Sequence, residues 1–174
     1  MSELERARAH YGALQEKARL AAALAIRSVL QIDLRITPWS NKAERALSEQ
    51  WPNDLRAVDW DWPDKMRRHS SPKDFKMVFW MPEDRLVGLA IATLPKDTYS
   101  TLRFVEGDPR PCCPYRGKRV LFALEALSNY VQASGREEIR IHPLNEALAS
   151  LYQDAYGFEL VRPHKQGPYY SKRV

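Results

Sequence analysis

The sequence predicts a mixed α/β protein with one main domain and an additional helix at its amino terminus. A chain of 174 residues and 20.2 kDa is too short for two independent cores. Strand-like runs separated by short turns fill the first part of the chain, and the later part alternates strand, helix, strand and helix. The pattern therefore favours a mixed sheet flanked by helices.

Residues 3 to 30 contain no proline and are rich in alanine, leucine, arginine and glutamate. Their apolar residues recur at steps of three or four, which is typical of an amphipathic helix. These are Leu4, Ala7, Tyr11, Leu14, Ala18 and Ala21 or Ala22. We expect residues 1–30 to form a helical extension that packs either on the domain's own core or at a dimer interface, and residues 31–174 to form the main domain.

The next elements are predicted from the alternation of apolar and polar residues and from residues that favour caps and turns. Ile32, Leu34 and Ile36 alternate with polar residues and predict a strand, after which Ser40 or Asn41 can cap a helix that runs to about Glu49. The segment 51–71 is rich in proline and charge, with a short helix expected near 64–69. Residues 76–80 and 85–93 predict two strands joined by a turn at 82–84.

A third strand is expected at Thr101 to Glu106, with Leu102, Phe104 and Glu106 on one face and Arg103 and Val105 on the other. Residues 107–114 must then form a loop, because three prolines interrupt them. A helix follows from about residue 119 to the cap at Gly135. We expect a strand at 139–141, a helix at 145–155 and strands at 158–161 and 169–172.

The composition restricts the class of protein. Hydrophobic residues make up 44% and charged residues 28%, which is typical of a folded chain and not of a disordered one. No apolar run approaches the roughly 20 residues of a membrane span, and the amino terminus lacks a signal-peptide pattern. We therefore expect a cytoplasmic protein without a membrane partner. The net charge of +5 favours anionic partners.

The cysteine and histidine residues predict no metal centre. Cys112 and Cys113 are adjacent, which disfavours a disulfide and does not match the usual spacing of zinc ligands. The four histidines are scattered along the chain without a metal-like partner.

The start of the helix near residue 119 combines the features of an anion site. Arg116, Lys118 and Arg119 lie beside the free backbone amides and positive dipole of a helix N-terminus, and Gly117 allows close approach to a ligand. Four basic residues and no acidic residue lie between positions 110 and 119. This pattern suits a diphosphate or a 3′-phosphate, although a solvated basic helix start is the alternative. The glycine spacings of a P-loop or dinucleotide fingerprint are absent.

From about Ile32 to its end, the chain resembles the GNAT superfamily of acyl-CoA-dependent N-acyltransferases. The resemblance rests on the strand 102–106, on the turn from Tyr115 to Lys118, and on Asn145 followed by Leu151-Tyr152 and Gly157-Phe158. It implies a central mixed, mostly antiparallel sheet flanked by helices. In this family the turn binds the pyrophosphate of CoA through backbone amides, and the preceding strand pairs with the pantetheine arm.

The resemblance also implies a set of CoA-binding residues. Gly117 matches the first glycine of the family's pyrophosphate motif, and the other positions are Phe104, Val105, Arg116, Lys118, Arg119, Val120 and Asn145. The chain departs from the motif at Pro114, Arg119 and Leu121, and the loop 107–114 is longer than usual. Arg119 either points outward as a charge contact or fills the space that the pyrophosphate needs.

In such an enzyme a neutral amine attacks the thioester directly, so no covalent nucleophile is needed. Glu106 is the candidate base, acting directly or through water; the alternative is a structural carboxylate. Tyr152 matches the tyrosine that donates a proton to the thiolate of CoA, and a core tyrosine is the alternative. Trp60, Asp61 and Trp62 lie where the acceptor binds and could receive a cationic amine, or they could simply cover the sheet.

These observations predict an N-acyltransferase whose acyl donor is acetyl-CoA or a related acyl-CoA. The expected acceptor is an unidentified primary amine on a small molecule or a protein, and no metal is expected. The alternative is a catalytically inactive GNAT-fold protein that acts by binding or regulation. A nucleic-acid partner is the weakest of the alternatives, and a homodimer is left open.

Overall fold

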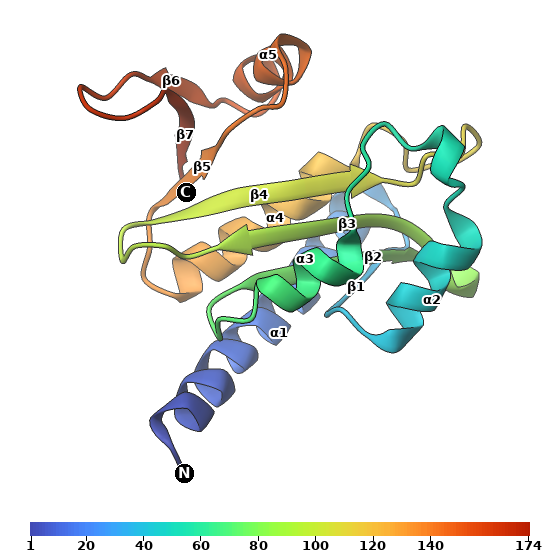
Figure 1. Cartoon of the computed structure of the whole chain (residues 1–174), viewed down its shortest axis with the longest axis horizontal. Helices are drawn as coiled ribbons and strands as arrows, with labels where there is room; N and C mark the ends of the chain where they lie inside the picture. Colours follow the sequence, from blue (N-terminus) through green and yellow to red (C-terminus); the bar gives the residue numbers. More distant parts are fainter.

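The computed structural model describes all 174 residues, and its centre is a seven-stranded sheet with the order β1-β2-β3-β4-β5-β7-β6 (Figure 1). All neighbouring strands are antiparallel except β4 and β5, which are parallel. The strands are β1 (Arg35–Thr37), β2 (Phe75–Met81), β3 (Arg85–Thr93), β4 (Tyr99–Gly107), β5 (Glu138–Ile141), β6 (Glu159–Val161) and β7 (Tyr169–Arg173). The prediction of a mixed, mostly antiparallel sheet is confirmed.

The chain also forms five α-helices and two short 3₁₀ turns. They are α1 (Glu3–Leu30), α2 (Asn41–Gln50), η1 (Asn53–Leu55), α3 (Trp62–Arg68), η2 (Pro82–Asp84), α4 (Arg119–Ala133) and α5 (Glu146–Asp154). Ser2 begins α1 as part of a capping box with Glu5, and Ser40 caps α2 by accepting from the Ala43 amide. None of the helices is both long enough and apolar enough to span a membrane.

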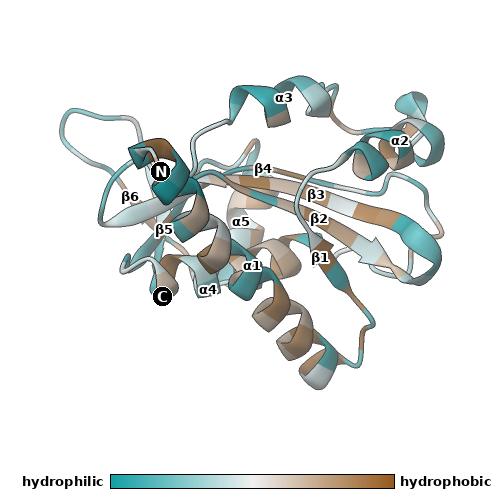
Figure 2. Ribbon diagram, turned by 90° about the horizontal axis from the view of Figure 1, so that it is seen from below, coloured by the Kyte–Doolittle hydropathy of each residue, from teal (hydrophilic) through white to brown (hydrophobic).

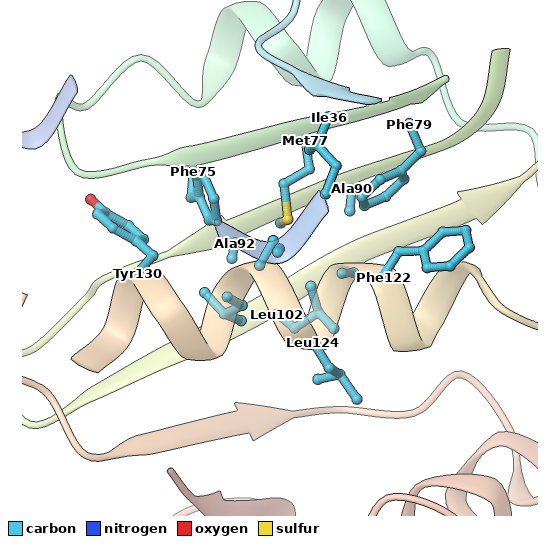
Figure 3. Packing of buried hydrophobic residues seen from close by; sticks show 14 of the residues in the cluster. Ile36, Phe75, Met77, Phe79, Ala90, Ala92, Leu102, Phe122, Leu124 and Tyr130 are labelled. Carbon is cyan, nitrogen blue, oxygen red and sulfur yellow. The ribbon is translucent and has the colours of Figure 1, made fainter. Parts of the chain in front are cut away.

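Helices cover both faces of the sheet, so the core has two parts. On one face α1 and α4 pack against the larger cluster, part of which is drawn in Figure 3. There Phe75 and Phe79 of β2 meet Tyr130 and Phe122 of α4. On the other face α2 and α3 cover a smaller cluster (Figure 2). The predicted N-terminal helix is therefore part of the domain's own core.

The face predicted for Leu102 in β4 is wrong, because the strand contains a β-bulge, whereas Phe104 and Glu106 share one face opposite Val105 as predicted. Phe104 pairs with Ile91 and Leu102 pairs with Ala92, so Arg103 is an extra residue without a partner on β3. The bulge puts Leu102 out of phase with the residues that follow it. Leu102 therefore packs on the α1 and α4 face together with Val105, whereas Phe104 packs on the α2 and α3 face.

Candidate functional site

The parallel strands β4 and β5 diverge along their length. Their pairing ends at Leu102 and Ile141, after which β4 continues to Gly107 while the chain after β5 turns away toward α5. The edge of β4 from Arg103 onward therefore has no strand beside it on the β5 side. A narrow cleft of about 80 Å³ lies at this divergence, and Tyr152 is among the residues that line it. We call this feature the β4–β5 wedge.

The first turn of α4 lies next to the β4–β5 wedge, because Val120 is part of the cleft lining. No side chain caps this helix. The backbone N–H groups of Gly117, Arg119, Val120 and Leu121 donate to no acceptor in the protein. Gly117 has φ +82°, and a β-carbon there would meet nothing within 4 Å. The turn therefore has four amide donors without an acceptor and open space beside Gly117, which suits an anion.

The basic side chains around this turn point in different directions. Arg116 is exposed and Lys118 is half-buried. Arg119 instead folds inward over β3 and β4, where a β-carbon on Gly107 would collide with its guanidinium group. Burial lowers the pKa of Arg119, and its Nη1 lies 3.7 Å from Sγ of Cys113. Arg116 and Lys118 are therefore the side chains left to meet an anion at the turn.

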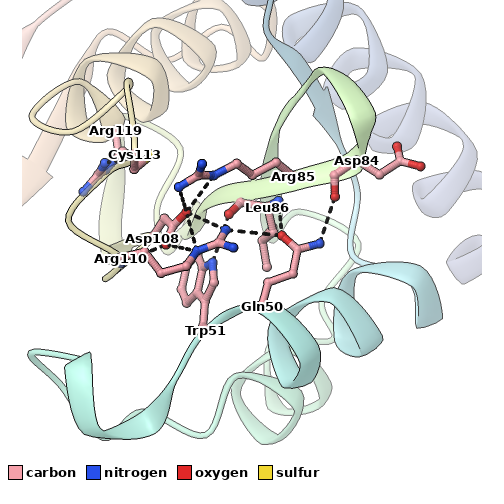
Figure 4. Close-up of polar contacts among 9 residues, drawn as sticks. All are labelled: Gln50, Trp51, Asp84, Arg85, Leu86, Asp108, Arg110, Cys113 and Arg119. Atoms are coloured by element: carbon pink, nitrogen blue, oxygen red, sulfur yellow. Dashed lines mark hydrogen bonds and ion pairs between the residues drawn. The ribbon is translucent and has the colours of Figure 1, made fainter.

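The loop 107–114 is held by a carboxylate that sequence reasoning missed. Asp108 has a fully buried side chain and accepts hydrogen bonds from Arg85 and Arg110 (Figure 4). Burial alone would raise the pKa of Asp108, but the bonds from Arg110 and Arg85 hold it below its usual value. Gln50 joins this network from α2 by contacting Arg110 and accepting from the Leu86 amide. The charge of Arg110 is thus used within the protein.

Glu106 also lies in a network of buried donors. Its side chain is 6% exposed, and its two oxygens accept from Nε and Nη2 of Arg56 at 2.7 Å each. The indole of Trp62 donates to Oε1, also at 2.7 Å. The hydrogen bond to Glu106 raises the pKa of Arg56. Sequence reasoning missed Arg56, which lies in the segment 51–71 that is rich in proline and charge.

The three residues predicted to bind the acceptor line one groove of about 990 Å³ beside α2 and α3. Trp62 is completely buried at its base, and Trp60 is half-buried and stacks edge-on against Phe104 with ring centres 5.0 Å apart. Asp61 is exposed and caps α3 by accepting from the Asp64 amide. Glu44 and Asp59 also line the groove, so its rim is acidic although the protein is basic.

Tyr152 lies in the β4–β5 wedge with Trp60, Phe104, Val105 and Val120, so the structure brings together five of the predicted site residues. Its ring packs edge-on against Phe158. Burial raises the pKa of Tyr152 to about 12, which keeps its hydroxyl protonated at neutral pH.

Asn145 lies at the start of α5. Its side chain is committed to that helix, because Oδ1 accepts from the Leu148 amide at 2.9 Å. No group of three or more His, Cys, Asp or Glu side chains is arranged to hold a metal ion.

No protein-family model and no curated protein sequence matches the chain. Its structure, however, is similar to many solved structures of acetyltransferases. An acetyltransferase from Thermus thermophilus is 16% identical with a TM-score of 0.58, covering 81% of this chain and 97% of that one. A GNAT-family acetyltransferase from Staphylococcus aureus is 13% identical with a TM-score of 0.59, covering 80% and 98%.

The ribosomal-protein-S18-alanine N-acetyltransferase from Escherichia coli is 16% identical with a TM-score of 0.58, covering 81% and 94%. The PaiA N-acetyltransferase from Thermoplasma acidophilum, solved in complex with coenzyme A, is 15% identical with a TM-score of 0.51, covering 81% and 99%. Together with the diverging strands β4 and β5, these similarities show that the chain has the GNAT fold.

Proposed function

We propose that this protein is an acyl-CoA-dependent N-acyltransferase that transfers an acetyl group from acetyl-CoA to a primary amine. The observation that carries the proposal is the position of the free amides of residues 117–121 next to the β4–β5 wedge. Its fold is that of acetyltransferases, one of which was solved with coenzyme A.

The chemistry of the residues present fits a CoA thioester. Phosphate oxygens are acceptors, and the turn at Gly117 offers donors without a side chain in the way. Arg116 and Lys118 add positive charge. The unpaired edge of β4 offers main-chain groups to the amides of a pantetheine arm, and the cleft beside it has a mostly apolar lining.

In the proposed reaction the amine nitrogen forms a bond to the thioester carbonyl carbon, and the bond from that carbon to sulfur breaks. Tyr152 donates its hydroxyl proton to the departing thiolate; the hydroxyl carries that proton at neutral pH, as any tyrosine with a pKa of 10 or above does. The base must accept a proton from the amine. Oε2 of Glu106 accepts only from Arg56 and keeps a second acceptor position, so we assign the base role to that oxygen, directly or through water.

We place the acceptor amine in the groove beside α2 and α3. Trp60 offers a partly exposed ring face, and Asp59 and Asp61 place negative charge on the rim. A cationic amine would be attracted to this rim before it loses its proton.

The second candidate is a GNAT-fold protein that binds a ligand or partner without catalysis. Three observations favour it: Arg119 folds inward, Glu106 is already paired with Arg56, and Asn145 caps its own helix. The two candidates share one fold and differ in whether CoA binds and turns over.

Calorimetric titration with CoA and acetyl-CoA tests the proposal, using Gly117→Glu with Gly135→Glu as the matched control. Both glycines have positive φ (+82° and +79°) and open space at the β-carbon, and they lie at opposite ends of α4. Backbone strain is therefore similar, but only Gly117→Glu places a carboxylate where the phosphates would bind.

We expect wild type and Gly135→Glu to bind acetyl-CoA with similar affinity and Gly117→Glu to bind about 100-fold more weakly, equivalent to about 2.7 kcal/mol. Release of the CoA thiol in the presence of a panel of primary amines then tests turnover. Wild-type protein that shows no heat of binding at millimolar acetyl-CoA would contradict the proposal and favour the second candidate.

A further inference from the structure

Helix α1 has a second apolar face that the protomer does not use. Its inner face is buried against the core by Ala18, Ala22 and Ile26. On the opposite side Leu20 and Leu24 are 61% and 57% exposed and follow one another at a helical spacing of four. Figure 2 shows the apolar C-terminal half of α1 on the side of the molecule that faces the viewer.

The outer face of α1 forms one wall of a groove of about 1,100 Å³. The opposite wall is the segment 33–38, which includes β1, the strand at the edge of the sheet. We call this feature the α1–β1 groove. It lies on the sheet face opposite to α2 and α3, so an occupant would leave the proposed acceptor groove open.

Charged residues flank the exposed leucines on the same stripe. At 100° per residue, Glu16, Leu20, Leu24 and Arg27 project within about 80° of one another. All four line the α1–β1 groove. Glu16 and Arg27 take part in none of the ion pairs of the protomer.

This stripe is complementary to itself when two copies run antiparallel. If a two-fold axis passes near position 22, Leu20 meets the partner's Leu24 and Glu16 meets the partner's Arg27. The same contacts are then made twice, as a two-fold interface requires. A parallel arrangement would instead place Glu16 against the partner's Glu16 and Arg27 against the partner's Arg27.

We propose that the α1–β1 groove is a homodimer interface in which α1 packs antiparallel against α1 of a second copy. The leucines at its centre are shielded from water, and an ion pair closes each end. The self-complementary order of charge and leucine identifies the occupant as another copy of this chain. This proposal is independent of the proposed enzymatic activity.

Sedimentation velocity over a concentration series tests the dimer. We expect the wild-type protein at about 0.1 mM to sediment as a species with twice the 20.2 kDa mass of one chain. The Leu20→Glu/Leu24→Glu double variant should remain monomeric at the same concentration. Leu4→Glu/Val29→Glu is the matched control, since Leu4 and Val29 are exposed leucine and valine residues of α1 outside the groove. It should dimerise like wild type.

Charge reversal distinguishes the antiparallel pairing from general adhesion of apolar surface. Glu16→Arg or Arg27→Glu alone places like charges opposite each other at both ends of the interface. Either change should raise the dimer dissociation constant by about tenfold or more. The combined variant restores opposite charges and should return the constant to near the wild-type value. A wild-type monomer at every concentration, or failure of the combined variant to recover, would overturn the proposal.

Discussion

The two ends of the proposed active site treat their polar groups in opposite ways. At the start of α4, the amides of Gly117, Arg119, Val120 and Leu121 have no acceptor in the protein. At the end of β4, earlier in the chain, the carboxylate of Glu106 is held by donors from two other side chains, Arg56 and Trp62. The turn at α4 is thus free to bind a ligand, whereas Glu106 is largely engaged by the fold itself.

Burial accounts for this difference. Gly117 is exposed, so water can satisfy the free amides of the turn until a ligand replaces it. The side chains of Glu106 and Arg56 are 6% and 10% exposed, and a buried charge is costly unless it is paired. A functional residue that is buried must therefore also serve the stability of the domain.

Removal of the buried carboxylate should give the largest effect. Glu106→Ala leaves the buried Arg56 with only the Trp60 carbonyl as a partner and no carboxylate to balance its charge, so we expect the free energy of unfolding to fall by about 3–5 kcal/mol. In a chain of this size that lowers Tm by about 10 °C. Thermal denaturation with Glu137→Ala as the control checks this prediction.

Glu137 pairs with Arg173 at the same 2.7 Å, but both side chains are more than two-thirds exposed. Its loss should cost about 1 kcal/mol or less. If Glu106→Ala kept the wild-type Tm and lost only turnover, Glu106 would be a base without a structural role. The contrast between the free amides at the start of α4 and the engaged carboxylate at the end of β4 would then be wrong.

Loss of the Tyr152 hydroxyl should have an intermediate effect that is confined to catalysis. If this hydroxyl protonates the thiolate, Tyr152→Phe lowers kcat by about 100-fold and leaves KM for acetyl-CoA nearly unchanged. Tyr156→Phe, a change at a neighbouring half-buried tyrosine, should keep full activity. Steady-state kinetics of both variants test this prediction. Equal activity of Tyr152→Phe and wild type would show that Tyr152 is a core residue without a catalytic role.

The raised pKa of Tyr152 also predicts a pH dependence of stability. Burial holds the folded-state pKa at about 12, whereas a tyrosine in the unfolded chain ionises near its ordinary pKa of 10. The unfolded state therefore releases its proton first, and stability falls as pH rises from about 10 to about 12. Denaturation at high pH should show a smaller loss in Tyr152→Phe than in wild type.

Asn145 should give the smallest effect. Asn145→Ala removes the acceptor for the Leu148 amide and should cost about 1 kcal/mol, a few degrees in Tm. Asn145→Asp keeps the cap and should keep the Tm. A loss of acetyl-CoA affinity in Asn145→Ala without any change in Tm would show that the side chain binds the ligand in preference to its own helix.

Most of the secondary structure could be predicted from local patterns. The helix at residues 3–30, the Ser40 cap and the turn at 82–84 depend on neighbours close in sequence, and the structure has each of them. The strand expected at residues 32–36 is shorter, with β1 covering only Arg35–Thr37, although Ile32 and Leu34 are buried as their alternation predicted.

The contents of the site were harder to predict, because they depend on partners distant in sequence. Arg56 and Glu106 are 50 residues apart, and Gln50 and Arg110 are 60 residues apart. The bulge at Arg103 is set by pairing with β3 and leaves no clear local signal, so the predicted face was wrong for Leu102, which precedes the bulge. An aspartate followed by proline and arginine, as at Asp108, was the one local hint of the buried network.

The sequence by itself determined the order of elements, the basic turn before α4 and the amphipathic α1, since each depends on periodicity, caps and glycine or proline. Only the tertiary structure decided which charges remain available. In the folded protein Arg119 points inward, Arg110 pairs with Asp108, and Glu106 pairs with Arg56. A charged group that folding removes from water needs a partner, and that partner comes from whichever segment packs against it. The amides at residues 117–121 kept their capacity to bind because the turn remained at the surface.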